Sequence, residues 1–375
     1  MNTEKVYTVI GLMSGTSLDG IDAALIRTDG VGFARRLHFI SMPYDDDLRA
    51  QLRACLGQRE DPDGRINRTA LAMTQAHAAA VDWVLARAEM NPADIDLIGF
   101  HGQTVFHAPQ DGFTWQIGHG GMLARLCGIP VVYDFRSADV AAGGEGAPLI
   151  PLYHAALAAD LEKPAAILNI GGVGNMTYIG ARPDEILAFD TGPGNALMDD
   201  YMKTRTGHDF DESGLYARQG QASETVLEAL LSHSYFDRKP PKSLDRDEWD
   251  VNALLASLSA PDAMATLAAF TVQSIAAGFR HLPDMPRALY VTGGGRHNRF
   301  VMDMLARRLN IPVRTVDDLG WDGDALEAEG FAYLAVRSVL GLPLSLPTTT
   351  GVAAPQTGGV LHMPACREQN GEAAS

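Results

Sequence analysis

The spacing of hydrophobic positions changes several times along the chain, and these changes predict the order of its elements. Three apolar runs typical of strands open the sequence, at Val6–Leu12, Ile21–Ile26 and Phe33–Ser41. Between residues 66 and 90 the apolar side chains recur at roughly helical spacing, which predicts a long helix. The other elements expected in this half are a strand at Leu97–His101, a further strand after it, a short helix at Gly121–Cys127 and a strand at Val131–Tyr133.

The pattern then restarts. Strands are expected at Ala165–Ile170, Met176–Ile179, Ile186–Asp190, Ala288–Thr292 and Val313–Val316, and helices at Pro261–Arg280, Arg299–Leu309 and Ala325–Leu340. The chain is therefore predicted to contain two copies of β-β-β-α-β-α-β-α, each opening with a glycine-rich hairpin. Two unrelated α/β domains remain the alternative, because the copies share little residue identity. Two related domains that face each other would form a cleft with a hairpin on each wall.

A run of Gly, Ala and Pro near Gly143–Pro148 marks the expected domain boundary. The prediction is an N-terminal α/β domain over residues 1–142 and a second one over residues 143–340. Residues 341–366 are able to pack back on the first domain, and residues 367–375 are expected to be a disordered tail. The proline- and charge-rich segment Ser232–Asn252 has the composition of a surface insertion.

Composition narrows the class of protein. The 375 residues are 46% hydrophobic and 20% charged, as in soluble globular enzymes. The net charge of −16 argues against nucleic acid or an anionic membrane as partner, but not against ATP. The three cysteines, Cys55, Cys127 and Cys366, have no metal-site spacing, and no signal or membrane-spanning run is present in the sequence. A cytoplasmic protein with no membrane partner is expected.

The first hairpin carries the most informative motif. Its turn holds glycines that let backbone N–H groups approach a ligand, together with hydroxyl and carboxylate side chains. Asp19 and Asp22 are able to hold Mg²⁺ directly or through water, so the turn suits a metal–triphosphate. It is not a Walker-type loop, and an ordinary hairpin turn is equally compatible with the spacing. The candidate nucleotide-binding residues here are Gly15, Thr16, Ser17, Leu18, Asp19, Gly20, Ile21 and Asp22.

Two further glycine-rich turns suit a nucleotide. The second hairpin, Asn169–Asn175, would present backbone amides, although glycine turns are common. The run Thr292–Asn298 would let a flat ligand such as adenine lie against the backbone, or it is simply a strand-to-helix turn. Their candidate residues are Gly171, Gly172, Asn175, Gly293, Gly294 and Gly295.

Five polar residues are candidates for chemistry or substrate binding. Asp190 ends an apolar strand, where a general base and a helix or turn cap are equally plausible. Arg136 is able to pair with a substrate carboxylate or with a neighbouring aspartate. His101 and Gln103 follow a strand end, a place where histidines are more often structural. Glu327 begins the last helix, where an acid is favoured by the helix dipole in any case.

These motifs, in this order, resemble the anhydro-N-acetylmuramic acid kinase family, within the superfamily of sugar kinases, actin and heat-shock chaperone ATPases. The resemblance extends from about Val9 to Pro364. It is carried by Gly11–Asp22, His101–His107, Asp134–Pro148, Asn169–Asn175, Phe189–Asn195, Thr292–Asn298 and Asp324–Ala335, and by the late Thr- and Gly-rich segment.

The resemblance implies an α/β fold of two duplicated RNase H-like, actin/hexokinase-type domains flanking a deep ATP and sugar cleft. It implies that 1,6-anhydro-N-acetylmuramic acid is phosphorylated with ATP, water and Mg²⁺ to N-acetylmuramic acid 6-phosphate and ADP, as part of murein recycling. Asp190 matches the catalytic base. The three glycine-rich segments match ATP-binding ones, and the sugar-binding candidates are Arg136, Glu327, His101 and Gln103.

Other functions remain open at this point. One is another sugar kinase, or a chaperone-type ATPase, of the same superfamily. Another is a non-catalytic sugar sensor, against which Asp190 and the complete first hairpin both argue. A homodimer is compatible with the sequence, although nothing in it requires one.

Overall fold

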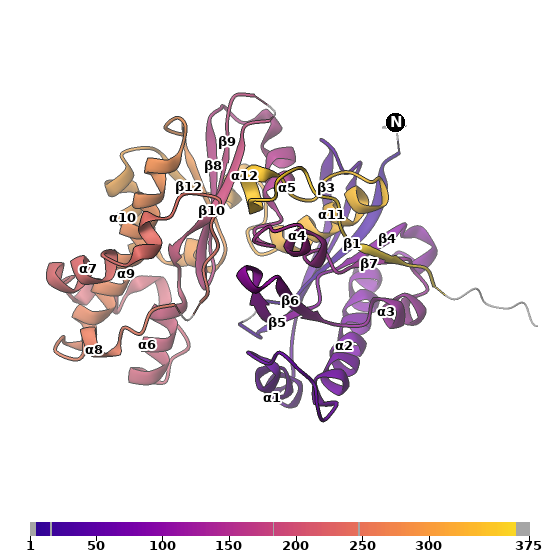
Figure 1. Cartoon of the computed structure of the whole chain (residues 1–375), viewed down its shortest axis with the longest axis horizontal. Helices are drawn as coiled ribbons and strands as arrows, with labels where there is room; N and C mark the ends of the chain where they lie inside the picture. Colours follow the sequence, from indigo (N-terminus) through magenta and orange to yellow (C-terminus); the bar gives the residue numbers. More distant parts are fainter. Residues whose placement is uncertain (1–4, 16, 183, 247, 365–375) are drawn as a thin grey trace, which may run out of the picture. The chain divides into compact units, whose positions relative to one another are not determined.

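The computed structural model describes residues 5–15, 17–182, 184–246 and 248–364, which divide into two compact α/β units (Figure 1). Of the described residues, the first unit contains 5–15, 17–138, 327–344 and 357–364. The second consists of Asp139–Leu326 and Ser345–Gln356. The chain therefore passes between the units more than once.

The first unit is built on a six-stranded sheet with the order β13-β7-β4-β1-β2-β3. β1 pairs antiparallel with β2 and parallel with β4, and β4 pairs parallel with β7. A separate two-stranded sheet contains β5 and β6. The strands are β1 (Tyr7–Met13), β2 (Gly20–Thr28), β3 (Ala34–Pro43), β4 (Leu97–Phe100), β5 (Gln103–Ala108), β6 (Phe113–Ile117), β7 (Val131–Tyr133) and β13 (Val360–His362).

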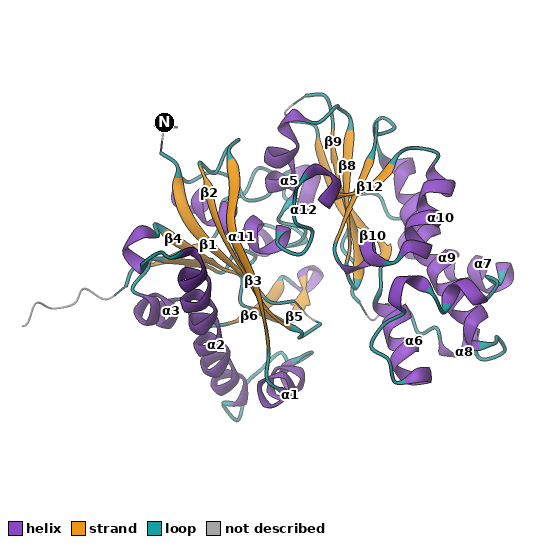
Figure 2. Ribbon diagram, turned by 180° about the vertical axis from the view of Figure 1, so that it is seen from behind, coloured by secondary structure: helices purple, strands orange, loops and turns teal. Residues whose placement is uncertain are grey.

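Helices cover both faces of this sheet. α2 runs alongside the strands (Figure 2), and its Met73 and Val81 share a buried cluster with Ile10 and Leu12 of β1. Successive strand residues point to opposite faces, so Gly11 faces the other way, toward α11. The helices of this unit are α1 (Asp46–Cys55), α2 (Arg65–Ala88), α3 (Gly120–Cys127), α11 (Leu326–Val339) and the short 3-10 helices η1 (Pro92–Asp94) and η2 (Pro109–Asp111).

The second unit repeats the architecture. Its five-stranded sheet has the order β10-β9-β8-β11-β12, with antiparallel pairs β8–β9 and β9–β10 and parallel pairs β8–β11 and β11–β12. This is the same order and direction as β3-β2-β1-β4-β7, so the predicted duplicated RNase H-like fold class is confirmed. The strands are β8 (Ala165–Ile170), β9 (Val173–Ile179), β10 (Ile186–Pro193), β11 (Leu289–Thr292) and β12 (Val313–Thr315).

The second sheet is also covered on both faces. Phe189 of β10 and Phe270 of α9 belong to the main buried cluster, whereas Ile167 of β8 packs with Ala158 on the opposite face. The helices are α4 (Ser137–Ala141, at the junction with the first unit), α5 (Pro151–Leu157), α6 (Ala196–Thr206), α7 (Glu224–Leu231), α8 (Asn252–Leu255), α9 (Ala260–Gly278), α10 (Arg299–Leu309) and α12 (Pro347–Thr350). The 3-10 helices are η3 (Ala158–Asp160), η4 (Glu212–Gly214), η5 (Ala217–Gln219), η6 (Ser234–Asp237), η7 (Phe279–His281), η8 (Gly294–His297) and η9 (Val316–Leu319). Among the described residues, no helix combines the length and the apolar character needed to cross a membrane.

The units differ from the predicted domains in the place of α11. This helix follows β12 in the sequence and was expected in the second domain, but it packs on the first sheet. A Cβ atom added at Gly11 would lie 1.8 Å from the carbonyl oxygen of Ala328, and one added at Gly99 would lie 2.2 Å from that of Phe331. The helix backbone therefore touches the strand backbone directly, which the two glycines alone permit.

We predict that Gly99→Ala lowers the melting temperature, because the new methyl group collides with the backbone of α11. Overpacking of this kind usually costs about 1–3 kcal/mol. Gly32→Ala is the matched control, since a Cβ there meets no atom within 4 Å. Calorimetric melting of both variants tests the prediction, and equal melting temperatures would contradict it.

Candidate active site

The turn between β1 and β2 is held by side chains from outside the hairpin. Leu18 has a φ of 61°, and its N–H donates to the carbonyl of Gly15 over 3.2 Å. The Ser14 hydroxyl donates to the carbonyl of Gly102 over 3.0 Å, and Arg49 Nε donates to the carbonyl of Leu18 over 3.1 Å. The turn therefore has a defined conformation, as a backbone-lined ligand site requires. Sequence reasoning missed Arg49 because it lies on α1, 31 positions beyond Leu18.

Some of the predicted ATP-binding residues of this hairpin have side chains that a ligand cannot reach. Leu18 and Ile21 are buried in the first core, so only their backbone is available to a ligand. Ser17 and Asp19 are exposed, and Asp22 is half-buried on β2, opposite Met13. Gly15 is half-buried in the turn, Gly20 approaches the Met42 carbonyl closely, and Thr16 lies outside the described residues.

Gln103 supports the first hairpin from the neighbouring β5. Its Nε2 donates to the carbonyl of Gly15 over 3.1 Å, and the side chain is fully buried. Its Oε1 is also buried and has no hydrogen-bond donor within the part of the chain that the structure describes. The geometry thus links the predicted sugar-binding Gln103 to the predicted phosphate-binding turn.

His101 and Arg136 form a buried pair in the same unit. His101 Nδ1 lies 2.8 Å from the carbonyl of Gly102, so this nitrogen carries the proton. Nε2 then accepts from Arg136, whose Nε and Nη2 lie 3.2 and 3.0 Å away. Burial and the Arg136 guanidinium hold the pKa of His101 well below its usual range, so the ring stays neutral. His101 therefore orients the guanidinium.

α11 completes this region. The ring of Phe331 lies 4.5 Å from that of His101 and 5.4 Å from that of Phe135, between centroids. Glu327 lies in the first turn of α11 and is half-buried. The neighbouring Glu329 is buried and pairs with Arg36 at 3.6 Å, so the two acids of this turn have different surroundings.

In the second unit, the β8–β9 turn is shorter than predicted, since β9 already begins at Val173 and leaves Gly171 and Gly172 as the turn. The start of α6 packs against these two residues. Asn195 N donates to the carbonyl of Gly171 over 2.7 Å, and Gly194 N donates to that of Gly172 over 2.9 Å. A Cβ at Gly194 would lie 2.2 Å from the Gly171 carbonyl oxygen, so this position requires glycine.

The structure brings the second hairpin, Asp190 and the third glycine run to one end of the second sheet. Asn175 lies opposite Asn169 on one side and Asp190 on the other. The turn Gly293–Gly295 lies against the same end, where a Cβ at Gly293 would be 2.1 Å from Asn169 Oδ1. Arg296, which follows this turn, is buried, bonds to both carboxylate oxygens of Asp324 at 2.8 Å and donates to the Gly293 carbonyl over 3.1 Å.

Asp190 lies at a β-bulge of β10 and is only 9% exposed. Its N–H donates to the carbonyl of Lys242 over 2.9 Å, and its carbonyl accepts from the Tyr235 hydroxyl over 2.5 Å. Its carboxylate Oδ2 accepts from the N–H of Leu244 over 2.8 Å. Both its backbone and its carboxylate are thus held by one segment.

That segment corrects an expectation. Ser232–Asn252 has the composition of a surface insertion, but Tyr235, Phe236 and Lys242 within it are buried. The ring of Trp249 packs 5.5 Å from that of Phe270. Its aromatic residues provide the apolar contacts, and its charged residues lie mainly on the outside, which explains the polar composition.

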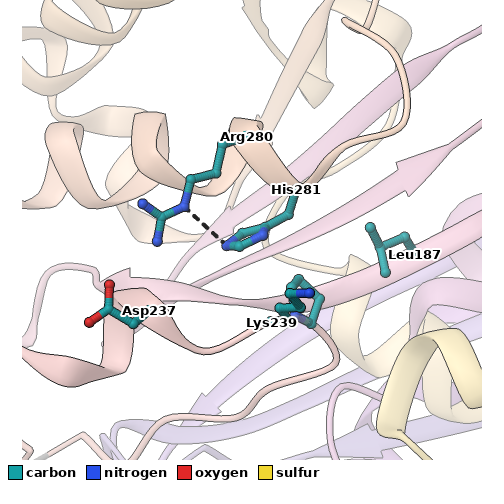
Figure 3. A pocket seen from close by; sticks show the side chains of 6 residues that line it. Leu187, Asp237, Lys239, Arg280 and His281 are labelled. Carbon is teal, nitrogen blue, oxygen red and sulfur yellow. Dashed lines mark hydrogen bonds between the residues drawn. The ribbon is translucent and has the colours of Figure 1, made fainter.

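An open hollow of about 450 Å³ lies beside β10 in the second unit (Figure 3). Leu187 of β10 lines it, together with Asp237 and Lys239 of the segment just described. Arg280 and His281 line the other side, and their side chains are joined by a 3.4 Å contact. Two exposed cationic side chains, Lys239 and Arg280, thus lie at this hollow together with one carboxylate, that of Asp237.

No group of three or more His, Cys, Asp or Glu side chains among the described residues is arranged to hold a metal by itself. Asp19 and Asp22 nevertheless provide the hard oxygen donors that Mg²⁺ prefers.

The two α/β units contain sheets of the same strand order, and each sheet has a glycine-containing hairpin between its first two strands. These features define a duplicated RNase H-like protein. The family model of anhydro-N-acetylmuramic acid kinase matches residues 7–364. A relative with that name from Rhizorhabdus wittichii is 52% identical over 95% of this chain and 98% of its own. Another, from Paramagnetospirillum magneticum, is 50% identical over 95% and 99%. The chain belongs to the anhydro-N-acetylmuramic acid kinase family.

The similarity to solved structures is more distant. The activator of 2-hydroxyisocaproyl-CoA dehydratase from Clostridium difficile, with bound ADPNP, has a TM-score of 0.47 at 12% identity, covering 89% of this chain and 96% of its own. A ROK family glucokinase from Streptomyces griseus, in complex with glucose and AMPPNP, has a TM-score of 0.40 at 15% identity, covering 87% and 98%.

Proposed function

We propose that this protein is a cytoplasmic, ATP-dependent kinase that opens the 1,6-anhydro ring of 1,6-anhydro-N-acetylmuramic acid with water and phosphorylates O6. The products are N-acetylmuramic acid 6-phosphate and ADP, which gives the reaction a place in murein recycling. Family membership over residues 7–364 supports the proposal. The observation that carries its mechanism is the geometry of Asp190.

A general base must be fixed relative to the proton that it removes. Asp190 meets this need, because the Leu244 amide orients its carboxylate and the bulge holds its backbone. Low exposure protects the group from bulk water, which would otherwise hydrolyse ATP without sugar. We assign Asp190 as the catalytic base.

The reaction then proceeds with a balanced movement of electrons. Asp190 removes a proton from water as the water oxygen attacks C1. The C1–O6 bond breaks and leaves its electron pair on O6, which attacks the γ-phosphorus of ATP. The bond between that phosphorus and the bridging β,γ-oxygen breaks, and its pair leaves with ADP. The water attacks the face of C1 opposite O6, as in an inverting glycosidase, with the phosphoryl group in place of the acid's proton.

ATP is assigned to the three glycine-rich turns. The first hairpin, from Gly15 to Asp22, supplies backbone amides and the Ser17 hydroxyl to the phosphates. Mg²⁺, held through water by Asp19 or Asp22, would neutralise charge on the transferring phosphoryl group. In the second unit, the residues assigned to ATP are Gly171, Gly172, Asn175, Gly293, Gly294 and Gly295.

The sugar is assigned to the first unit's polar residues. Arg136, with its fixed guanidinium, suits the lactyl carboxylate of the muramic acid. His101 contributes by orienting Arg136, and Gln103 by supporting the turn at Gly15. Glu327, half-buried in the first turn of α11, is assigned to the sugar hydroxyl groups.

Asp190→Asn should lower turnover by about 10²–10⁴-fold, because the amide cannot accept the proton from water. The measurement is ADP release from magnesium-ATP with and without the anhydro-sugar, together with the mass of the sugar product. ATP affinity, measured by calorimetric titration, should change little.

Asp250→Asn is the control, because this carboxylate is exposed on the same segment. A product that gains one phosphate and one water supports the coupled reaction. Near-native turnover in Asp190→Asn would disprove the role of Asp190. Rapid ATP hydrolysis at a rate that does not depend on the sugar would instead favour an ATPase of the same superfamily.

His101→Phe should raise the KM for 1,6-anhydro-N-acetylmuramic acid about tenfold, since hydrogen bonds to charged groups contribute about 1.5–3 kcal/mol. The phenyl ring preserves the contact with Phe331 but cannot accept from Arg136. The KM for 1,6-anhydro-N-acetylglucosamine, which lacks the lactyl carboxylate, should change much less. Equal changes for both sugars would show that the His101–Arg136 pair does not serve the carboxylate.

A further inference from the structure

Lys242 is a buried cation with no place in the mechanism so far. Its side chain is 3% exposed, although lysines are almost never buried to this extent unless they are paired. Its ammonium donates to the carbonyl of Tyr235 over 3.1 Å and lies 4.2 Å from the centroid of the same ring. Burial of an ammonium is costly, and these contacts offset only part of that cost.

Lys242 closes a ring of contacts around Asp190. Its backbone carbonyl accepts from Asp190 N, and its side chain bonds to Tyr235, whose hydroxyl donates to the Asp190 carbonyl. Leu244, two residues further on, holds the Asp190 carboxylate. The ammonium therefore ties together the two ends of the segment Tyr235–Leu244, which we call the Asp190 clamp.

The charge of Lys242 also acts on Asp190. Asp190 and Asp237 attract the ammonium, whereas Arg238 and Arg280 repel it. Glu145 and Glu248 also act electrostatically on the neighbouring Tyr235. Burial, then Arg280 and Arg238, lower the pKa of Lys242 to about 8, so the ammonium is still mainly protonated at neutral pH. An opposite charge at close range favours the ionised form of a carboxylate.

We propose that Lys242 is a positioning residue for the catalytic base: it closes the Asp190 clamp, and its charge keeps the Asp190 carboxylate ionised. This inference rests on the proposed function only in calling Asp190 a base. The clamp itself stands on the hydrogen-bond geometry of the second unit alone.

The first test is the pH dependence of kcat/KM for the anhydro-sugar. In Lys242→Met the acidic limb should move to higher pH by about one unit, because the carboxylate loses the cation that favours its ionisation. Lys239→Met is the matched control, since this exposed lysine lies three residues earlier and should leave the limb in place. A lower plateau with an unmoved acidic limb would overturn the electrostatic part of the proposal.

The second test needs neither the substrate nor a stable Lys242 variant. Carbon-13 NMR of the full-length protein follows the Asp190 carboxyl, assigned by its loss in Asp190→Asn. In the wild type this signal should show its own titration and a second inflection near the pKa of Lys242, at about 8. Absence of the second inflection would overturn the proposal, whatever the activity. The inflection together with a lack of sugar kinase activity would uphold the clamp and reject the proposed function.

Tyr235→Phe separates position from charge. It removes the hydroxyl that bonds to the Asp190 carbonyl but leaves the ammonium in place. Turnover should fall while the acidic limb stays where it is in the wild type. A limb that moves as far as in Lys242→Met would show that the charge of Lys242 is not the cause.

Discussion

The direct backbone contact between α11 and the first sheet is the constraint on which the rest of this unit depends. At Gly11 and Gly99 no side chain separates the helix from the strands. This close approach places Phe331 against His101, and His101 in turn orients Arg136. The absence of side chains at Gly11 and Gly99 thus contributes to the position of the Arg136 guanidinium group.

The second unit uses the same strand order but stabilises its site in another way. The bulge at Asp190 interrupts the ladder of β10, and backbone and side-chain donors from the Asp190 clamp replace the lost regularity. The second hairpin is supported by amides at the start of α6, whereas the first is supported by side chains such as Ser14 and Arg49. The two units therefore share the strand order of the sheet but differ in the contacts that hold their hairpin turns.

Buried charged groups mark the positions where distant parts of the chain must meet. Arg296 joins the third glycine run to Asp324. Asp139 accepts hydrogen bonds from Gly146 N and from the hydroxyls of Ser345 and Thr350, and so attaches the late segment Ser345–Gln356 to the second unit. A buried charge is costly unless its hydrogen bonds are satisfied, so these contacts favour one relative position of the segments that supply them.

The sequence by itself predicted the order of most strands and helices along the chain and located the motifs around Asp190, Gly15 and Gly293. Related and unrelated domains were both compatible with it, and the matching strand order of the two sheets decided for duplication. The predicted elements and motifs are local in the sequence. The spacing of hydrophobic residues indicates which face of an element is buried, and a glycine often indicates that another group approaches the backbone closely. Only the tertiary structure decided that α11 belongs to the first unit and that Tyr235, Lys242 and Leu244 hold Asp190. The same is true of the contacts of His101 and Gln103 with neighbouring protein groups. Each of these depends on contacts between residues far apart in the chain, and neither period nor composition carries that information.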